Sequence, residues 1–133
     1  MSVGARDTIN IDESVHEIYK QLTEGNDPVN APFKTMKDVF LWAACLGFKA
    51  GSRKALDGKK VTIFRWAQFN QQIDLPLIKS LILSDTSSLD ILDKQDDLIE
   101  IIEEFANSGA LELKNMLADN SMNTLWHFVE RIK

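Results

Sequence analysis

The sequence is poor in residues that build metal sites and disulfides. Its 133 residues include one cysteine and two histidines. The single Cys45 cannot form an internal disulfide, which is typical of proteins in a reducing cytoplasm. His16 and His127 have no cysteine or histidine near them at the spacing of zinc ligands. We therefore predict a cytoplasmic protein with no metal.

Long apolar runs and catalytic motifs are also missing. The longest apolar stretch, residues 39–48, is about half of the roughly 20 residues that a membrane helix requires. Residues 1–10 lack the basic start and apolar segment of a signal peptide. There is no glycine-rich phosphate loop, no paired-histidine motif, and no nucleophile with an identifiable base. We expect no membrane insertion, no cofactor and no enzymatic activity.

The residues that are present predict a soluble, mainly α-helical domain. The composition is 44% apolar and 26% charged, as in ordinary globular proteins. Apolar residues recur at helical spacing along most of the chain. We predict one compact bundle of five or six helices over residues 12–133, with residues 1–11 as a flexible N-terminal arm. The expected helices cover residues 12–24, 35–50, 73–83, 95–107, 110–117 and 122–132.

Local signals mark where these helices begin and end. Thr35, followed by Asp38 three residues later, resembles a capping box at the start of a helix, and Gly51 marks its end. Ser108 and Gly109 predict a stop after residue 107. Residues 61–66 are rich in β-branched and aromatic types, which favours a minor β element.

The helix at residues 73–83 is apolar nearly all round. Such a pattern is typical of a central, buried helix. A homodimer interface would cover the same side chains, so the pattern leaves both a core helix and a dimer open.

Charge is segregated along the chain. Residues 34–65 carry eight Lys or Arg against two acids, a net charge of +6, within a chain of net charge −5. Charge separated in this way concerns binding partners rather than fold. We call these eight cations the basic island. Its members are Lys34, Lys37, Lys49, Arg53, Lys54, Lys59, Lys60 and Arg65.

The basic island is the candidate nucleic-acid site. Phosphate binding requires several cations on one surface, and Trp42, Phe64 and Trp66 lie among them as candidates for base stacking. The alternatives are that these aromatic residues belong to the core, and that the cations dock an acidic protein or this protein's own acidic half.

Two blocks resemble a known family. The first runs from Phe33-Lys34-Thr35-Met36-Lys37-Asp38-Val39-Phe40 through Ala43-Ala44-Cys45-Leu46-Gly47-Phe48 to Gly51-Ser52-Arg53. The second is Ile102-Glu103-Glu104-Phe105-Ala106-Asn107-Ser108-Gly109, followed by Leu113. Together they resemble the small accessory proteins of bacterial DNA phosphorothioation (Dnd) systems, known as Dnd system-associated protein 4, over about residues 30–117. Phe105 replaces the usual Tyr of the family's EEYANGG segment, and Ser108 replaces the first Gly.

The resemblance implies a role in bacterial defence against foreign DNA, and it supplies no catalytic residues. We therefore predict a non-catalytic accessory subunit of a DNA-modification or anti-phage complex, which contacts DNA or a DNA-processing enzyme through the basic island. The alternative is a pure protein–protein adaptor for a larger ATPase or nuclease, without DNA contact. An enzyme with an active site that the sequence does not reveal is the third class.

Overall fold

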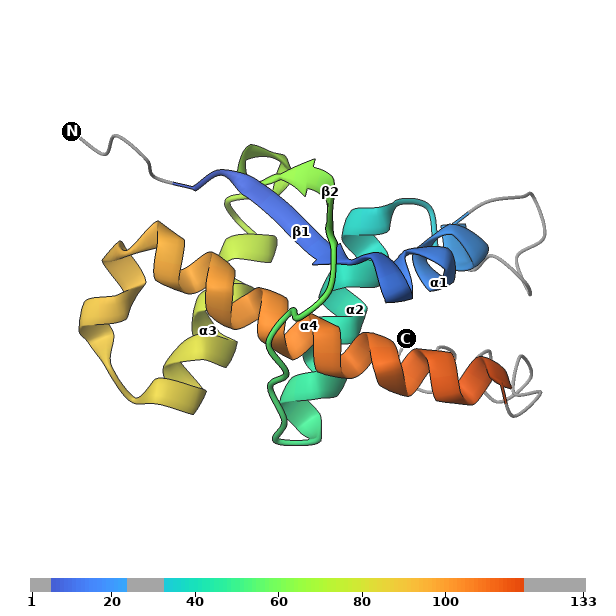
Figure 1. Cartoon of the computed structure of the whole chain (residues 1–133). Helices are drawn as coiled ribbons and strands as arrows, with labels where there is room; N and C mark the ends of the chain where they lie inside the picture. The colour runs from blue at the N-terminus through green and yellow to red at the C-terminus, as the bar shows by residue number, and fades with distance from the viewer. Residues whose placement is uncertain (1–5, 24–32, 119–133) are drawn as a thin grey trace.

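The computed structural model describes residues 6–23 and 33–118, and residues 1–5, 24–32 and 119–133 lie outside this description (Figure 1). Within these ranges the chain forms four α-helices and one two-stranded sheet. Two short 3-10 segments, Trp66–Gln68 and Leu89–Asp93, connect them. In chain order the elements are β1 (Thr8–Asp12), α1 (Glu13–Thr23), α2 (Met36–Lys49), β2 (Lys60–Arg65), α3 (Asp74–Thr86) and α4 (Gln95–Ala118).

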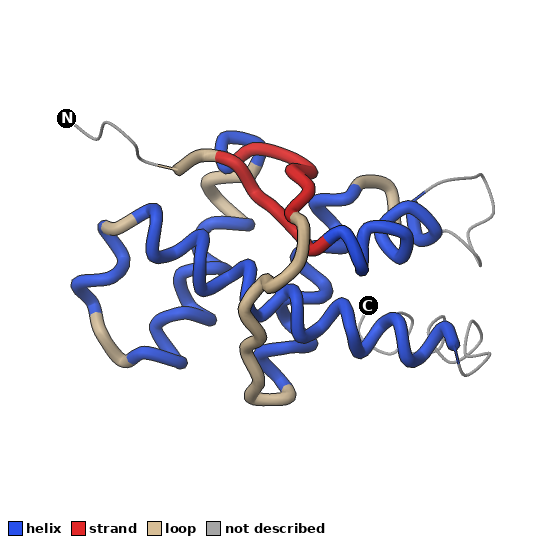
Figure 2. Tube along the Cα trace, in the orientation of Figure 1, coloured by secondary structure: helices blue, strands red, loops and turns tan. Residues whose placement is uncertain are grey.

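The long helix α4 organises the molecule. It runs through the middle of the fold, with α2 crossing behind it and the two strands lying along one side (Figures 1 and 2). Its residues Ile99, Ile102 and Phe105 are buried together with Val39, Phe40 and Ala43 of α2. The prediction of a mainly α fold with a minor β element is confirmed.

Helices α2 and α4 approach each other through glycine. A Cβ atom on Gly109 would overlap the carbonyl oxygen of Ala43, and one on Gly47 would overlap that of Phe105. Glycine inside a helix costs about 1 kcal/mol relative to alanine. Here the absence of a Cβ atom allows the two helix backbones to come into contact, so Gly47 and Gly109 determine where α2 and α4 cross.

The glycine at position 109 also corrects a sequence prediction. Residues 95–107 and 110–117 were expected to be separate helices with a stop at Ser108 and Gly109, but α4 is continuous from Gln95 to Ala118. A glycine ends a helix by local backbone freedom, whereas here its missing side chain serves a contact between helices. The expected last helix, at residues 122–132, lies outside the described residues.

Helix α2 begins and ends where its sequence indicates. The Thr35 hydroxyl accepts a hydrogen bond from the Asp38 backbone N–H at 3.2 Å, as an N-cap does. After Lys49 the chain turns through Gly51, whose φ of 68° suits glycine. Both predicted boundaries of this helix are confirmed.

The sheet pairs two strands that lie far apart in sequence. Strand β1 runs antiparallel to β2, with a bulge after Ile9. Ile9, Ile11 and Phe64 point into the core, whereas Thr62 and Arg65 are exposed. The prediction of a loose arm over residues 1–11 is wrong for residues 8–11. The isoleucines alternate with polar residues, and this two-residue period becomes a strand once β2 supplies a partner.

Helix α3 is a further correction. Only Asp74, Ile78 and Ile82 of this helix are buried, while Leu77 is 37% exposed and the preceding Ile73 is 69% exposed. The helix packs along one side only, so it is peripheral rather than central. None of the helices in residues 6–23 and 33–118 is long and apolar enough to cross a membrane.

Candidate functional site

The basic island divides into three groups in the fold. Lys34 and Lys37 lie at the start of α2, and Lys49, Arg53 and Lys54 lie at its end or just beyond it. The third group lies along β2 and comprises Lys59, Lys60 and Arg65. The two ends of a 14-residue helix are roughly 20 Å apart. The island is therefore distributed around the molecule.

Four of its cations form ion pairs with acids of the same molecule. The Lys37 ammonium lies 2.9 Å from a carboxylate oxygen of Asp74, which is buried and also accepts the Asn70 N–H. Lys59 lies 3.8 Å from Glu13, and Arg65 donates to Asp7 at 2.9 Å. These acids come from the N-terminal segment and from α3, which lie far from the island in the sequence.

Arg53 is held by two acidic residues and an aromatic ring. Its guanidinium lies 3.6 Å from Asp85 of α3 and 3.7 Å from Glu104 of α4. The guanidinium carbon lies 5.8 Å from the centre of the Phe105 ring, within the range of a cation–π contact. Arg53 thus joins the loop after α2 to two helices.

The remaining cations differ in their surroundings. Lys34, Lys49 and Lys54 are exposed, and Lys60 lies at a charged cleft described below. Of the aromatic residues proposed to stack on bases, Phe64 is only 7% exposed and packs edge-on against Phe40. Trp42 and Trp66 are half-buried, and Trp66 packs against Phe69. Phe64 belongs to the core and is not available for stacking.

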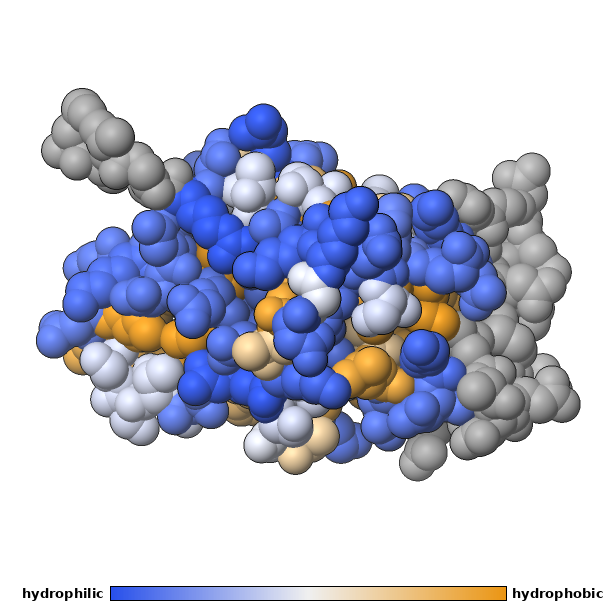
Figure 3. Space-filling view, viewed as in Figure 1, coloured by the Kyte–Doolittle hydropathy of each residue, from blue (hydrophilic) through white to orange (hydrophobic). Residues whose placement is uncertain are grey.

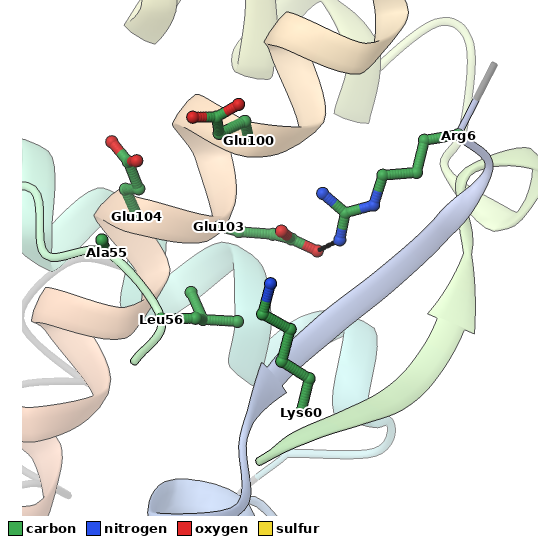
Figure 4. A pocket seen from close by; sticks show the side chains of 7 residues that line it. All are labelled: Arg6, Ala55, Leu56, Lys60, Glu100, Glu103 and Glu104. Atoms are coloured by element: carbon green, nitrogen blue, oxygen red, sulfur yellow. Dashed lines mark hydrogen bonds and ion pairs between the residues drawn. The ribbon is translucent and has the colours of Figure 1, made fainter. Parts of the chain in front are cut away.

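A charged cleft lies between α4, the loop after α2 and the segment that leads into β1 (Figure 4). Its volume is about 270 Å³. Arg6, just before β1, and Lys60 of β2 point into the cleft from one side, and the carboxylates of α4 line another side. Ala55 and Leu56 of the loop after α2 complete the lining. The charged residues that line it are Arg6, Lys60, Glu100, Glu103 and Glu104.

Glu103 is the central residue of the cleft. Its carboxylate, in a residue only 5% exposed, accepts hydrogen bonds from the Arg6 guanidinium and, at 2.7 Å, from the Asn10 backbone N–H. Burial raises the pKa of this carboxyl, and the two hydrogen bonds together with the charges of Arg6 and Lys60 offset part of that rise. Glu103 therefore joins the outer edge of β1 to α4.

Four further hydrogen bonds attach distant segments to α4. The Arg6 backbone N–H donates to Asp96 at 2.6 Å, and the Gln95 side chain donates to the Arg6 carbonyl. One turn beyond Glu103, the Asn107 amide donates to the carbonyls of Lys54 and Ala55. The polar face of α4 holds both the first strand and the loop of the basic island.

Sequence reasoning missed Arg6, Glu103 and Asn107. Arg6 lies in the segment predicted to be a flexible arm, and Glu103 and Asn107 enter the sequence analysis only as members of the second family-like block. A signal was present for Glu103, because Ile99, Ala106 and Ala110 lie on the same side of the helix and are buried. An acid within such a stripe indicates a buried partner.

The cleft contains the ion pair between Arg6 and Glu103, and its lining residues include no Ser, Thr, Cys or His. Cys45 is half-buried in α2, and burial raises the pKa of its thiol, the opposite of what an activated thiolate requires. Across the described ranges, no group of three or more His, Cys, Asp or Glu is arranged to hold a metal ion.

These features define, over the described residues, a small mainly helical protein with internal ion pairs spread over its surface and a charged cleft beside α4. The chain belongs to the DNA sulphur modification system-associated protein 4 family, which matches residues 8–131. The match confirms the resemblance seen in the sequence and extends it to β1. No curated protein and no solved structure is significantly similar to the chain.

Proposed function

We propose that this protein is a non-catalytic accessory subunit of a bacterial DNA phosphorothioation system that works as a protein–protein adaptor. It docks onto a larger protein of that system, such as an ATPase or a nuclease, and does not hold DNA through the basic island. Family membership supports the association with a DNA sulphur modification system, and the pairing of the surface charges supports the adaptor role.

The observation that carries the proposal is the internal pairing of the basic island. Lys37, Arg53, Lys59 and Arg65 all lie within 4 Å of carboxylates of the same chain. A cation that already has a carboxylate partner releases few counterions when it meets a phosphate, and counterion release drives non-specific DNA binding. The chain as a whole has a net charge of −5, which adds to the repulsion of a polyanion.

Exposed apolar side chains favour a protein partner. Ile73 and Leu77 lie one helical turn apart at the start of α3, and Leu89 in the following 3-10 segment is 70% exposed. Hydrophilic side chains otherwise dominate much of the face drawn in Figure 3, with apolar side chains gathered in a few places between them. Apolar residues within a polar surround are typical of contact surfaces between proteins.

The test is co-expression of the tagged chain with the proteins encoded beside it in a DNA sulphur modification operon. We expect a larger protein to co-purify after nuclease digestion and at 0.5 M salt. In parallel, the isolated chain should show no salt-dependent binding to a DNA duplex.

Two results would overturn the adaptor proposal. One is capture that disappears on nuclease digestion. The other is duplex binding by the isolated chain that falls steeply with salt and is lost when Lys49 and Lys54 are changed to Glu. The matched control is Glu at Lys79, a half-buried lysine of α3 outside the basic island.

A further inference from the structure

We propose that the outer edge of β2, at Lys60 and Thr62, receives an extended acidic segment of the partner protein as a third strand of the sheet. This inference rests on the adaptor function proposed above and names how the partner is held. It concerns the edge of β2 that faces away from β1 and α4.

The register of the sheet decides which backbone groups face outward. In an antiparallel pair, residues that bond across the ladder alternate with residues whose N–H and C=O point away from it. The Glu13 N–H donates to the Lys59 carbonyl and the Trp66 N–H to the Asp7 carbonyl, both at 2.7 Å. Counting from these bonds through the register, Lys60, Thr62 and Arg65 of β2 direct their backbone groups away from β1.

Hydrogen bonds to side chains support this assignment. Asn10, which pairs with Thr62, donates its backbone N–H to Glu103 and not to β2. Arg65 donates its backbone N–H to the Gln68 side chain at 2.9 Å. The backbone N–H and C=O groups of the pairs Asn10–Thr62 and Thr8–Arg65 therefore point away from the partner strand, as the alternation requires.

These same bonds occupy the outward N–H groups of Asn10 on β1 and of Arg65 on β2. Glu103 covers the edge of β1, and Gln68 closes the end of β2. Within the described part of the chain, the outward backbone groups of Lys60 and Thr62 have no hydrogen-bond partner, and both residues are exposed. A two-stranded sheet with one open edge is a template for strand addition, in which backbone hydrogen bonds supply affinity.

Charge selects the occupant. The exposed cations Lys59 and Arg65 lie at the two ends of this edge, and a second copy of the chain would bring its own two cations against them. The Lys60 side chain points into the cleft beside Glu103 and contributes only its backbone groups to the edge. The carboxylates that pair with Lys59 and Arg65 are more than half exposed, so these pairs contribute little to stability. Pairing leaves these cations with little attraction for a phosphate chain in solution, but a strand that backbone hydrogen bonds already hold at the edge can place its own carboxylates beside them. A peptide strand supplies both acceptors and donors to the edge, whereas a nucleic-acid backbone supplies acceptors only. The arrangement therefore favours an acidic, extended segment of another protein.

The test compares Thr62→Pro with Thr62→Val in the co-expression experiment. Proline removes the outward N–H and adds a ring at the edge while leaving the β1 ladder intact. Valine keeps the N–H and loses only the side-chain hydrogen bond from Thr62 to Asn10. We expect Thr62→Pro to reduce capture of the larger protein at least about tenfold and Thr62→Val to retain it, with Lys59→Glu reducing capture about threefold.

A second measurement removes any dependence on the folding of the proline variant. In the wild-type complex, amide hydrogen exchange at Lys60 and Thr62 should slow at least about tenfold relative to the free chain. Equal capture by both Thr62 variants with unchanged exchange would overturn strand addition while the adaptor function stands. Failure of the wild-type chain to capture any co-expressed protein would overturn both proposals, and a dimer of the isolated chain that Thr62→Pro dissolves would make a second copy the occupant.

Discussion

The two sides of α4 are built on opposite principles. The side that faces α2 is apolar and so close that Gly47 and Gly109 leave no room for a Cβ atom. The side that faces the strands holds Glu103 and Asn107, which bind the backbone and side chains of segments far away in sequence. The difference shows which contacts of α4 a substitution or a binding partner can replace without disturbing the scaffold. The first side fixes the scaffold by shape, whereas the second attaches segments by individual bonds that a partner or a mutation can replace.

The largest effect is expected from adding one methyl group on the close-packed side. In Gly109→Ala the new Cβ overlaps the Ala43 carbonyl, so the helices must separate. We expect the free energy of unfolding to fall by about 3 kcal/mol, the upper part of the range for overpacking. Urea denaturation measures it. Gly58→Ala is the matched control, because a Cβ there meets only a side-chain oxygen of Asp12 at 3.9 Å, and a similar loss in both variants would contradict the close-packing argument.

An intermediate effect is expected on the polar side. Glu103→Ala leaves the Asn10 N–H and the Arg6 guanidinium without their acceptor, and we expect the free energy of unfolding to fall by about 2–3 kcal/mol. Glu103→Gln keeps an acceptor oxygen and should remain within about 1 kcal/mol of the wild type. Equal losses in the two variants would mean that the hydrogen bonds are not what matters.

The same pair of proteins tests the titration of Glu103. Because its pKa is raised in the folded state, the folded protein binds this proton more tightly than the unfolded chain does. The contribution of Glu103 to the free energy of unfolding is fully present below its ordinary pKa of 4.5 and is lost as pH rises through the raised pKa of the folded state. Unfolding free energies measured across this window should decline more for the wild type than for Glu103→Gln, and parallel curves would contradict the raised pKa.

The smallest effect is expected at the exposed ion pairs of the basic island. Arg65 and Asp7 are 63% and 56% exposed, so solvent screens their attraction. A double-mutant cycle with Arg65→Ala and Asp7→Ala should give a coupling energy below about 0.5 kcal/mol that weakens further with salt. A coupling energy above about 1 kcal/mol would contradict this prediction and show that the Arg65–Asp7 pair stabilises the fold as the hydrogen bonds of Glu103 do.

The sequence predicted those parts of the fold whose cause is local. The Thr35 cap, the Gly51 turn and the β-rich run before Trp66 each carry their signal within a few residues, and all three are confirmed. The errors have causes that lie far along the chain. Residues 8–12 form a strand only because β2 pairs with them, and Gly109 continues a helix only because α2 crosses there.

The candidate site was less accessible to sequence reasoning. A count of charges finds the basic island but cannot find its partners, because Asp7, Glu13, Asp74, Asp85 and Glu104 come from four other segments. The Glu103 contact was hidden for the same reason, since Arg6 and Asn10 lie more than 90 residues before it. Pairing between distant charges depends on topology, and topology depends on the whole chain.

The attachment of β1 has a consequence for how the protein is made. Strand β1 is synthesised before the segments that hold it, because its partner strand begins at residue 60 and its anchor on α4 is residue 103. Strand β1 must therefore wait until α4 has been synthesised, and contacts that span such distances slow folding relative to a simple helical bundle. Until β2 and α4 have both been made, Ile9 and Ile11 lack their partner strand and part of the core that buries them, so β1 stays exposed on the growing chain.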